Sequence, residues 1–414
     1  MAGIGITLTR TDIGSILTTI SKQEPSLLDT VENIMYELKS LNDGSTFRMP
    51  GLGITHGRYQ RMFMNATQDR KDTSEMFWNL LDKLVTIRSS SRGNVVVDFY
   101  EDIPIDFKPC LITDASARVK STYQYHPQYR NDMVFLKKAT KLYTNLVCHL
   151  INLSSGKEAY RNPEKFKVLV ETITRIINSK PDEQFLVIHL KSNDIYGRDD
   201  ITKKIPKKAL NPERVSFLSY GYHTATNDYQ HIPNIILCGI PFYEEAAYEA
   251  IGRAAANRPT SKGEFCKEDI HYIKSGEHQH HILQSACRGI IRKCINNTCP
   301  NADLYVIAHQ NTGINEDLLK SVFPKCKVIL ETELTDMQKL ALDFIVSKLS
   351  AGADTIYLKE LLRITGKRNN STFLRDIYKN SFKQAMNDLG LIIVGNGAER
   401  RFIKGIMMQD EEMT

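Results

Sequence analysis

Three side chains that could bind phosphate recur at a regular spacing in the second half of the chain. The run QSACRGIIR, residues 284–292, places Gln284, Arg288 and Arg292 four residues apart. The surrounding apolar pattern indicates a helix, and on a helix these side chains would form a row along one face. Guanidinium groups pair with phosphoryl oxygens and stabilise charge that develops during phosphoryl transfer. The spacing therefore predicts a polyphosphate-binding row, and the alternative is an exposed basic helix face without a ligand.

A polar loop upstream supplies a second set of groups. The segment 219–221 (Ser-Tyr-Gly) is followed by Thr226, Asn227 and Asp228, shortly before the apolar run 234–238. A hydroxyl, an amide and a carboxylate ahead of a buried strand could contact a phosphate, a ribose or an arginine. Such a trio is also ordinary turn chemistry, because Asn, Asp and Thr side chains bond to nearby backbone groups.

The order of these segments resembles that of superfamily 2 nucleic-acid helicases. The run 284–292 resembles the sixth helicase motif, and 219–228 resembles the fifth. The strand expected at 185–190 lies where the fourth motif would be, and 110–117 is similar to the third. The likeness extends from about residue 108 to 327. It departs from the family at Cys287, where a glycine is usual, and in the spacing of the two arginines, which is four residues instead of three.

The resemblance implies a role for each of these residues. In the family, the arginines of the sixth motif reach across a cleft to ATP held by the other RecA-like domain. We therefore expect catalytic residues at Arg288, Arg292 and Gln284, nucleotide contacts at Asp228 and Gly221, nucleic-acid contacts at Thr226 and Asn227, and coupling of hydrolysis to movement at Asp114 and Ser116.

Two segments that would hold ATP in a helicase are absent from the sequence. A phosphate loop has the pattern Gly-x-x-x-x-Gly-Lys-Ser/Thr, whereas the two Gly-Lys pairs here read Gly156-Lys157-Glu158 and Gly366-Lys367-Arg368. No apolar run ends in an Asp-Glu-x-His/Asp box, and the similar stretch 95–102 is expected to be structural. ATP and Mg²⁺ would therefore be bound mainly by a RecA-like partner domain or subunit with a phosphate loop. The isolated chain is expected to be inactive.

The segments that must position these residues read as an α/β domain. Continuously apolar strands that alternate with helices indicate a parallel sheet covered on both faces, as in a RecA-like domain. The pattern predicts helices at 166–177, 244–256 and 279–295, and strands at 185–190, 215–219, 234–239, 304–308 and 328–330. The apolar segment 133–153 is expected to hold one helix and one strand.

The regions on either side have different patterns. Residues 1 to about 93 read as helix-rich, with amphipathic helices at 27–38 and 77–85, and short strands are expected at 94–97 and 109–113. The C-terminal region reads as three helices closed by a β-hairpin, a winged-helix-like plan. The expected elements there are helices at 340–349, 358–364 and 374–389 and a hairpin over 391–403.

Positive charge is concentrated in the C-terminal region. Residues 361–405 contain nine Lys or Arg and three acidic residues, and their net charge of +6 equals that of the whole chain. Such a concentration is the footprint of a surface that meets phosphates. The residues expected to contact nucleic acid are Arg375, Lys379, Lys383, Arg400 and Arg401. The alternative is a wing that docks a protein and has a solvated basic rim.

Composition limits the compartment and the chemistry. The 414 residues contain no apolar stretch of the ~18 to 20 residues that a membrane helix needs, and no secretory signal is recognisable. Eight scattered cysteines favour reduced thiols and hence the cytoplasm. A zinc site is not expected, because the spacing of Cys294 and Cys299 is unusual and no second cysteine pair follows the nearby histidines 278, 280 and 281.

These observations define three expected units and two hypotheses. The units are a helix-rich region with a remnant of a first RecA-like domain (1–160), a second RecA-like domain (161–333) and a basic winged-helix-like domain (334–414). The primary hypothesis is the C-terminal motor half of an ATP-dependent helicase or translocase acting on DNA, with RNA as the other candidate track. The alternative is a non-enzymatic DNA-binding subunit that uses a RecA-like scaffold and a winged helix.

Overall fold

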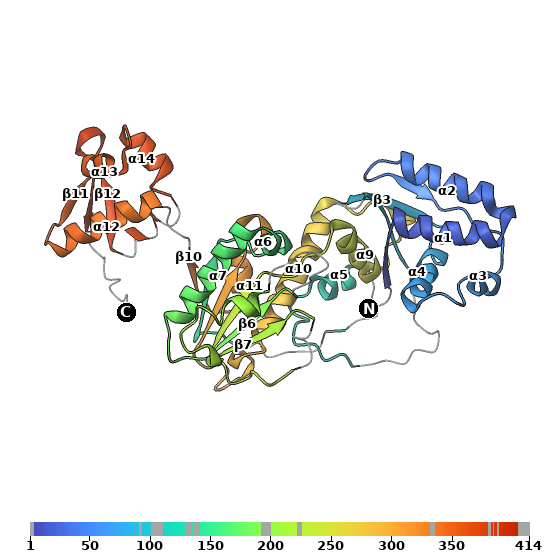
Figure 1. The fold of residues 1–414 in the computed structure, drawn as a ribbon, viewed down its shortest axis with the longest axis horizontal. Coiled ribbons are helices and arrows are strands. Elements are labelled where there is room, and N and C mark those ends of the chain that lie inside the picture. Colours follow the sequence, from blue (N-terminus) through green and yellow to red (C-terminus); the bar gives the residue numbers. More distant parts are fainter. Residues whose placement is uncertain are drawn as a thin grey trace.

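The computed structural model describes three groups of elements, each with an apolar core of its own (Figure 1). The residues described are 4–90, 93–100, 111–129, 134–135, 141–191, 200–221, 226–331, 336–379, 382–383, 385–386 and 389–404.

The first 100 residues contain an antiparallel sheet that was not predicted from the sequence. Its strands lie in the order β1-β4-β3-β2, and helices α1 to α4 share one core with it. The elements are β1 (Ile4–Thr9), α1 (Arg10–Gln23), η1 (Pro25–Leu27), α2 (Leu28–Ser40), β2 (Thr46–Arg48), α3 (His56–Met62), α4 (Gln68–Trp78), β3 (Leu84–Ser90) and β4 (Gly93–Tyr100). The expected strand at 94–97 lies within β4. The expected helix at 77–85 is wrong beyond Trp78, because Leu84 and Val85 begin β3 and bury Val85 against the helices.

The central group is an α/β unit around a six-stranded parallel sheet, which confirms the predicted fold class. The strand order is β10-β5-β9-β8-β6-β7. Its elements are α5 (Ser121–Tyr129), β5 (Leu146–Ile151), α6 (Lys157–Arg161), α7 (Pro163–Asn178), β6 (Phe185–His189), α8 (Ile201–Lys204), η3 (Pro212–Arg214), β7 (Val215–Ser219), β8 (Asn234–Cys238), α9 (Glu245–Ala256), η4 (Thr260–Lys262), α10 (Lys267–Ala286), η5 (Ile290–Arg292), β9 (Ala302–Ile307), η6 (Gln310–Thr312), α11 (Glu316–Val322) and β10 (Lys327–Glu331).

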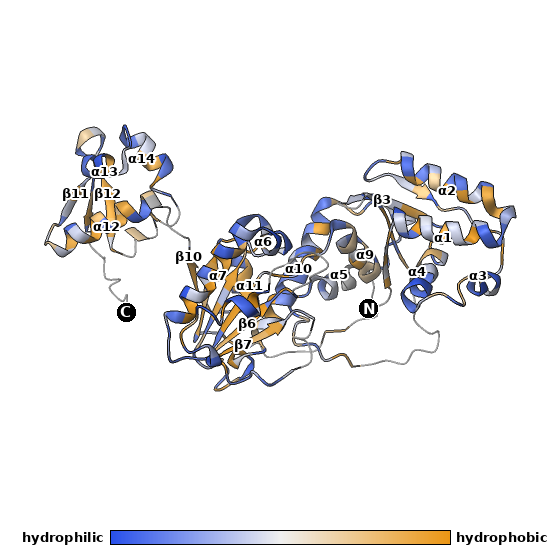
Figure 2. Ribbon diagram, viewed as in Figure 1, coloured by the Kyte–Doolittle hydropathy of each residue, from blue (hydrophilic) through white to orange (hydrophobic). Residues whose placement is uncertain are grey.

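Strand composition explains why this sheet forms. The middle strands are mostly apolar, and β6 and β8 are buried at every residue, with His189 and Asn234 as their polar members. Figure 2 shows these strands as hydrophobic and the outer faces of the surrounding helices as hydrophilic. Strand β5 lies between β10 and β9, so the sheet begins ahead of residue 161. The helix expected in the segment 133–153 falls largely on 136–140, outside the described residues, and the strand at 109–113 is absent from its described part, 111–113.

Helix α9 comes from the central part of the sequence but packs on the N-terminal sheet (Figure 1). Ala246 and Ala250 meet Val95 and Val97 on the face of the sheet that α1 to α4 leave uncovered. A Cβ atom added at Gly5 would lie 2.7 Å from the carbonyl carbon of Ala250. The small side chains therefore permit the close approach of helix and strand.

A buried ion network accompanies this contact. Glu249 and Arg253 on α9 are 0% and 1% exposed, and Arg253 Nε donates to Glu249 Oε1 at 2.8 Å. Arg88 on β3 donates from Nε to the other oxygen of Glu249 at 2.5 Å. Both oxygens of the buried carboxylate thus have cationic donors, one of them supplied by the N-terminal sheet.

The C-terminal group combines helices with a three-stranded antiparallel sheet in the order β11-β13-β12. The elements are α12 (Asp336–Ser350), β11 (Thr355–Tyr357), α13 (Leu358–Thr365), α14 (Asn370–Asp376), β12 (Leu391–Val394), η7 (Gly397–Glu399) and β13 (Arg401–Lys404). The predicted hairpin is present as β12 and β13. The single helix expected over 374–389 is wrong, because α14 ends at Asp376 and the N–H groups of Ile377 and Tyr378 both bond to the Phe373 carbonyl.

No helix among the residues described is both long and apolar enough to cross a bilayer.

A partly buried histidine on β5 is held by two carboxylates. His149 Nδ1 lies 2.7 Å from Glu331 and Nε2 lies 2.8 Å from Asp303, and the ring stacks on Tyr305. Burial lowers the pKa of His149, but hydrogen bonds to the two carboxylates outweigh it and raise this pKa from 6.5 to about 9. The histidine is therefore a cation at neutral pH.

Replacing His149 with Gln should destabilise the fold in a pH-dependent way. Because the pKa is raised in the folded state, the stabilisation is complete below about pH 6.5 and is lost as pH rises through about 9. The shift corresponds to at most about 3 kcal/mol. Urea unfolding at pH 6 and pH 10 measures the difference, with the exposed His231→Gln as control. An equal loss at both pH values would contradict the assignment.

Candidate functional site

The predicted helical row of Gln284, Arg288 and Arg292 is interrupted in the structure. Helix α10 ends at Ala286, so only Gln284 lies on it, and Arg292 belongs to the short turn η5. The expectation of one helix over 279–295 is therefore wrong. Cys287 caps the helix and Gly289 precedes η5, where the N–H of Ile290 bonds to the carbonyl of Ile232 at 2.9 Å and draws the chain towards the start of β8.

The guanidinium of Arg288 joins both predicted sets of residues. It folds back on α10 and donates from Nε to the Gln284 carbonyl at 3.2 Å and from Nη2 to Gln284 Oε1 at 3.0 Å. Its Nη1 donates to the Thr226 carbonyl at 2.9 Å. Gln284, Arg288 and Thr226 thus form one cluster, although 58 residues separate Thr226 from Gln284 in the sequence.

Arg292 extends the cluster to Asn227. Its Nη1 donates to Asn227 Oδ1. The turn that carries Arg292 is fixed by Lys141, whose ammonium donates to the carbonyls of Ile291, Arg292 and Lys293 at 2.5, 3.2 and 3.2 Å. Lys141 was not recognised in the sequence, where a lone lysine beside an apolar run gives no signal.

The two arginines retain donors for a ligand. Arg288 uses three of its five N–H groups and Arg292 one, in the contacts that the structure describes. Burial and the neighbouring charge of Arg292 lower the pKa of Arg288. Two guanidinium groups held side by side repel each other, and an anion with several oxygens would relieve that repulsion.

Asp228 closes a turn beside the cluster. Thr226 Oγ1 donates to Asp228 Oδ2 at 2.7 Å, and the N–H of Asp228 lies 3.2 Å from Thr226 Oγ1. This is the local turn chemistry that the sequence left open, and the exposed carboxylate still faces solvent. Gly221 lies at the opposite end of the strands from the cluster, two residues beyond the carboxyl end of β7. Its φ of +98° favours glycine.

Asp114 and Ser116 contact the helix that leads to the cluster. Ser116 Oγ donates to Asp114 Oδ1 at 2.5 Å and lies 2.7 Å from Nδ1 of His280 on α10. Burial raises the pKa of Asp114, but hydrogen bonds from Ser116 outweigh it and leave the pKa below its ordinary value. His280 precedes Gln284 by one helical turn on α10. This helix therefore connects the turn of Asp114 and Ser116 with the arginine cluster.

The residues of the C-terminal group that were predicted to contact nucleic acid differ in their surroundings. Arg375 pairs with Asp376 at 2.8 Å, and Lys367 reaches the same carboxylate at 2.9 Å. Lys379 and Lys383 are exposed. Arg400 and Arg401 bond to backbone carbonyls of the hairpin turn, at Gly395 and Glu399 respectively.

The histidines and cysteines near the cluster serve other contacts. His278 Nε2 lies 3.4 Å from the hydroxyl of Tyr248, Cys299 is buried and Cys294 is exposed. Among the described residues, no three His, Cys, Asp or Glu side chains converge on one point.

Comparisons with known proteins give distant structural neighbours. No family model and no curated protein matches the chain. A solved structure described as "XPD_Helicase" aligns with 79% of this chain at 11% identity and a TM-score of 0.35, and the alignment covers 65% of that structure. Another, described as "XPD_APO", aligns with 79% of this chain at 11% identity and a TM-score of 0.34, covering 73% of its own length. The chain thus spans less than two thirds of the first neighbour, and this similarity assigns no residue role.

Replacing Gly289 with Ala should disturb the cluster through packing. An added Cβ would lie 2.6 Å from Ile235 Cδ1 and 2.9 Å from the Ile232 carbonyl oxygen, so the turn or strand β8 must shift. We expect a loss of about 1 to 3 kcal/mol in the free energy of unfolding. The matched control is Gly57→Ala in α3, where nothing lies within 4 Å of the new Cβ. Urea unfolding compares the two, and equal stabilities would contradict the packing argument.

Proposed function

We propose that the chain is the C-terminal motor half of an ATP-dependent helicase or translocase that acts on DNA or RNA. Arg288 and Arg292 would contact the triphosphate across a cleft, with Gln284 orienting Arg288, while Thr226 and Asn227 would contact the nucleic-acid strand. ATP and Mg²⁺ would be bound mainly by a RecA-like partner that carries a phosphate loop. Asp228 would add a nucleotide contact, and Asp114 and Ser116 would relay movement through α10.

The observation that carries this proposal is the joining of the two predicted motifs. Arg288 bonds to Gln284 and Thr226, and Arg292 bonds to Asn227, so the arginine side chains are fixed while several of their donors stay available. Fixed guanidinium groups suit transition-state charge, because they need no rearrangement when charge develops. The cluster adjoins the amino end of β8 in a parallel α/β sheet.

The second candidate is a non-enzymatic DNA-binding subunit with a RecA-like scaffold and a winged helix. The exposed Lys379 and Lys383 in the C-terminal group favour it. In that case the arginine cluster would serve only to tie the turn η5 to the loop ahead of β8. The two candidates share the nucleic-acid contact and differ in the need for the arginines during turnover.

Removing the guanidinium of Arg288 should distinguish the motor function from the non-enzymatic DNA-binding function. The isolated chain should hydrolyse ATP no faster than a buffer blank, and addition of a phosphate-loop partner should produce nucleic-acid-stimulated turnover. In that complex Arg288→Ala should lower turnover on the order of a thousandfold or more, whereas unfolding and nucleic-acid binding stay close to those of the parent.

Two further variants make this test specific. Arg161→Ala removes an exposed arginine at the end of α6 and should leave turnover unchanged. Arg288→Lys keeps the charge but loses the forked geometry, so only partial activity is expected. Turnover within a few-fold of the parent for both Arg288→Ala and Arg292→Ala would leave the scaffold candidate standing.

Charge replacement in the C-terminal group should flatten the salt dependence of DNA binding. Removing one Lys or Arg that neutralises a phosphate lowers the slope of log affinity against log salt by about 0.9 on duplex DNA. Lys379→Gln with Lys383→Gln should lower the slope, whereas Arg375→Gln should change it less, because Asp376 already neutralises Arg375. Fluorescence anisotropy at several salt concentrations gives the slopes. Identical slopes for all variants would place the DNA-binding surface elsewhere.

A further inference from the structure

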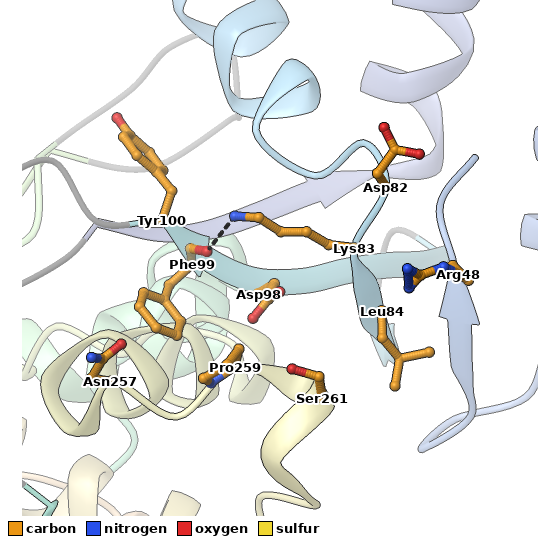
Figure 3. Close-up of a pocket in the computed structure, with 10 residues that line it drawn as sticks. All are labelled: Arg48, Asp82, Lys83, Leu84, Asp98, Phe99, Tyr100, Asn257, Pro259 and Ser261. Atoms are coloured by element: carbon orange, nitrogen blue, oxygen red, sulfur yellow. Dashed lines mark hydrogen bonds between the residues drawn. The ribbon is translucent and has the colours of Figure 1, made fainter. Parts of the chain in front are cut away.

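A pocket outside the arginine cluster lies between the N-terminal sheet and the turn that follows α9. Residues of β2, β3 and β4 form one side, and Asn257, Pro259 and Ser261 form the other (Figure 3). Its volume is about 580 Å³, within the range of pockets that hold small ligands. The proposed motor function does not use it.

A buried carboxylate with an unfilled acceptor lies at this pocket. Asp98 on β4 is 0% exposed, and its Oδ1 accepts a long hydrogen bond of 3.4 Å from the N–H of Thr260. Its Oδ2 has no hydrogen-bond partner. Figure 3 shows the carboxyl group directed towards Pro259 and Ser261. A buried acceptor without a donor is costly, so a ligand that supplies N–H groups would recover that free energy.

The charge of the pocket changes from this buried end to its rim. Arg48 is exposed at the rim. Figure 3 shows Lys83 directed away from Arg48, with its ammonium 3.4 Å from the Phe99 carbonyl oxygen. Burial raises the pKa of Asp98, while backbone N–H groups and the charges of Lys83 and Arg253 oppose the shift only in part. The pocket thus offers an acceptor inside and cations outside, together with the rim carboxylate of Asp82.

This arrangement selects among ligand classes. Arg48 and Lys83 disfavour a cationic ligand such as an amine or an arginine side chain. Among the described residues, Asp82 and Asp98 are the carboxylates that line the pocket, and no three metal-ligating side chains form a cluster. A neutral group with adjacent N–H donors, joined to an anion, satisfies both ends.

We propose that this pocket binds a guanine nucleotide, either free or as part of a nucleic-acid strand. Guanine presents two neighbouring donors, N1–H and the N2 amino group, which match the two oxygens of Asp98. Its phosphate would lie at Arg48. The apolar surfaces of Phe99, Leu84 and Pro259 border the space for the planar base, as Figure 3 shows.

Calorimetric titration of the full chain with guanosine monophosphate tests the proposal. We expect saturable binding that is at least ten-fold tighter than that of adenosine monophosphate, because adenine lacks the paired donors. Asp98→Asn preserves shape and should lower the affinity for guanosine monophosphate at least ten-fold. Asp69→Asn, an exposed position on α4, is the matched control and should bind like the parent.

A rim variant keeps the test informative if Asp98→Asn fails to fold. Arg48 is exposed, so Arg48→Gln should fold normally. It should weaken binding of guanosine monophosphate several-fold and leave binding of guanosine, which has no phosphate, unchanged. Equal weakening of both ligands would contradict the placement of the phosphate.

Short single strands distinguish the two sources of the nucleotide. A six-nucleotide thymidine strand with one guanine is compared with the strand that lacks it. Tighter binding of the guanine strand than of guanosine monophosphate would identify a strand as the source, and the reverse order would identify the free nucleotide. No saturable binding of any guanine ligand at millimolar concentration, or unchanged binding by Asp98→Asn, would overturn the proposal. Both results are independent of ATP turnover.

Discussion

The buried contact of Glu249 with Arg253 and Arg88 holds helix α9 of the central group against the N-terminal sheet. Glu249 and Arg253 on α9 are almost fully buried, and the carboxylate has one cationic donor from its own helix and one from β3. Removing one partner of such a pair would leave an uncompensated buried charge, which is far more costly than removing a surface ion pair. Helix α9 is therefore fixed to the N-terminal sheet, although its sequence lies between two strands of the parallel sheet.

This constraint has consequences for α10, which packs beside α9 and then returns the chain to the parallel sheet. The start of α10 is tied to α5 through the hydrogen bond from Tyr125 to Asp269, and its second half contacts Ser116 through His280. The helix ends at Ala286, and Gly289 then packs against Ile235. The arginine cluster thus lies where a helix anchored in one unit meets a strand of another. A displacement of α10 would move the Arg288 side chain together with Gln284.

The two ligand-binding regions differ in how their polar groups are satisfied without a ligand. Arg292 is exposed, so water can fill the donors that Asn227 leaves available, at little cost in free energy. Asp98 is buried and has an acceptor that the protein leaves unfilled. The first arrangement suits a ligand that arrives with a partner domain, and the second suits a small molecule that enters a fixed pocket.

Several features could be predicted from local sequence alone. The parallel sheet followed from the apolar runs at 185–190 and 234–239, and the C-terminal hairpin followed from two short runs around a glycine-rich turn. These elements are specified by neighbouring residues, because burial on both faces or a tight turn leaves a short-range pattern. The four-residue spacing of Gln284 and Arg288 also placed these two side chains close together, and they are hydrogen-bonded in the structure.

The rest depended on contacts between distant segments. Strands β1 to β3 escaped prediction because half of their residues face helices from the same unit, and the helical pattern at 77–85 was overridden by pairing of β3 with β4. The path of the chain after α10 depends on the close contact of Gly289 with Ile235, which no local pattern reveals. Asp98 belongs to the stretch 95–102 that was expected to be structural, and its buried, unfilled oxygen depends on the turn at Pro259 to Ser261, which lies against β4. Sequence spacing thus determined which residues could act, whereas tertiary packing decided which of them meet.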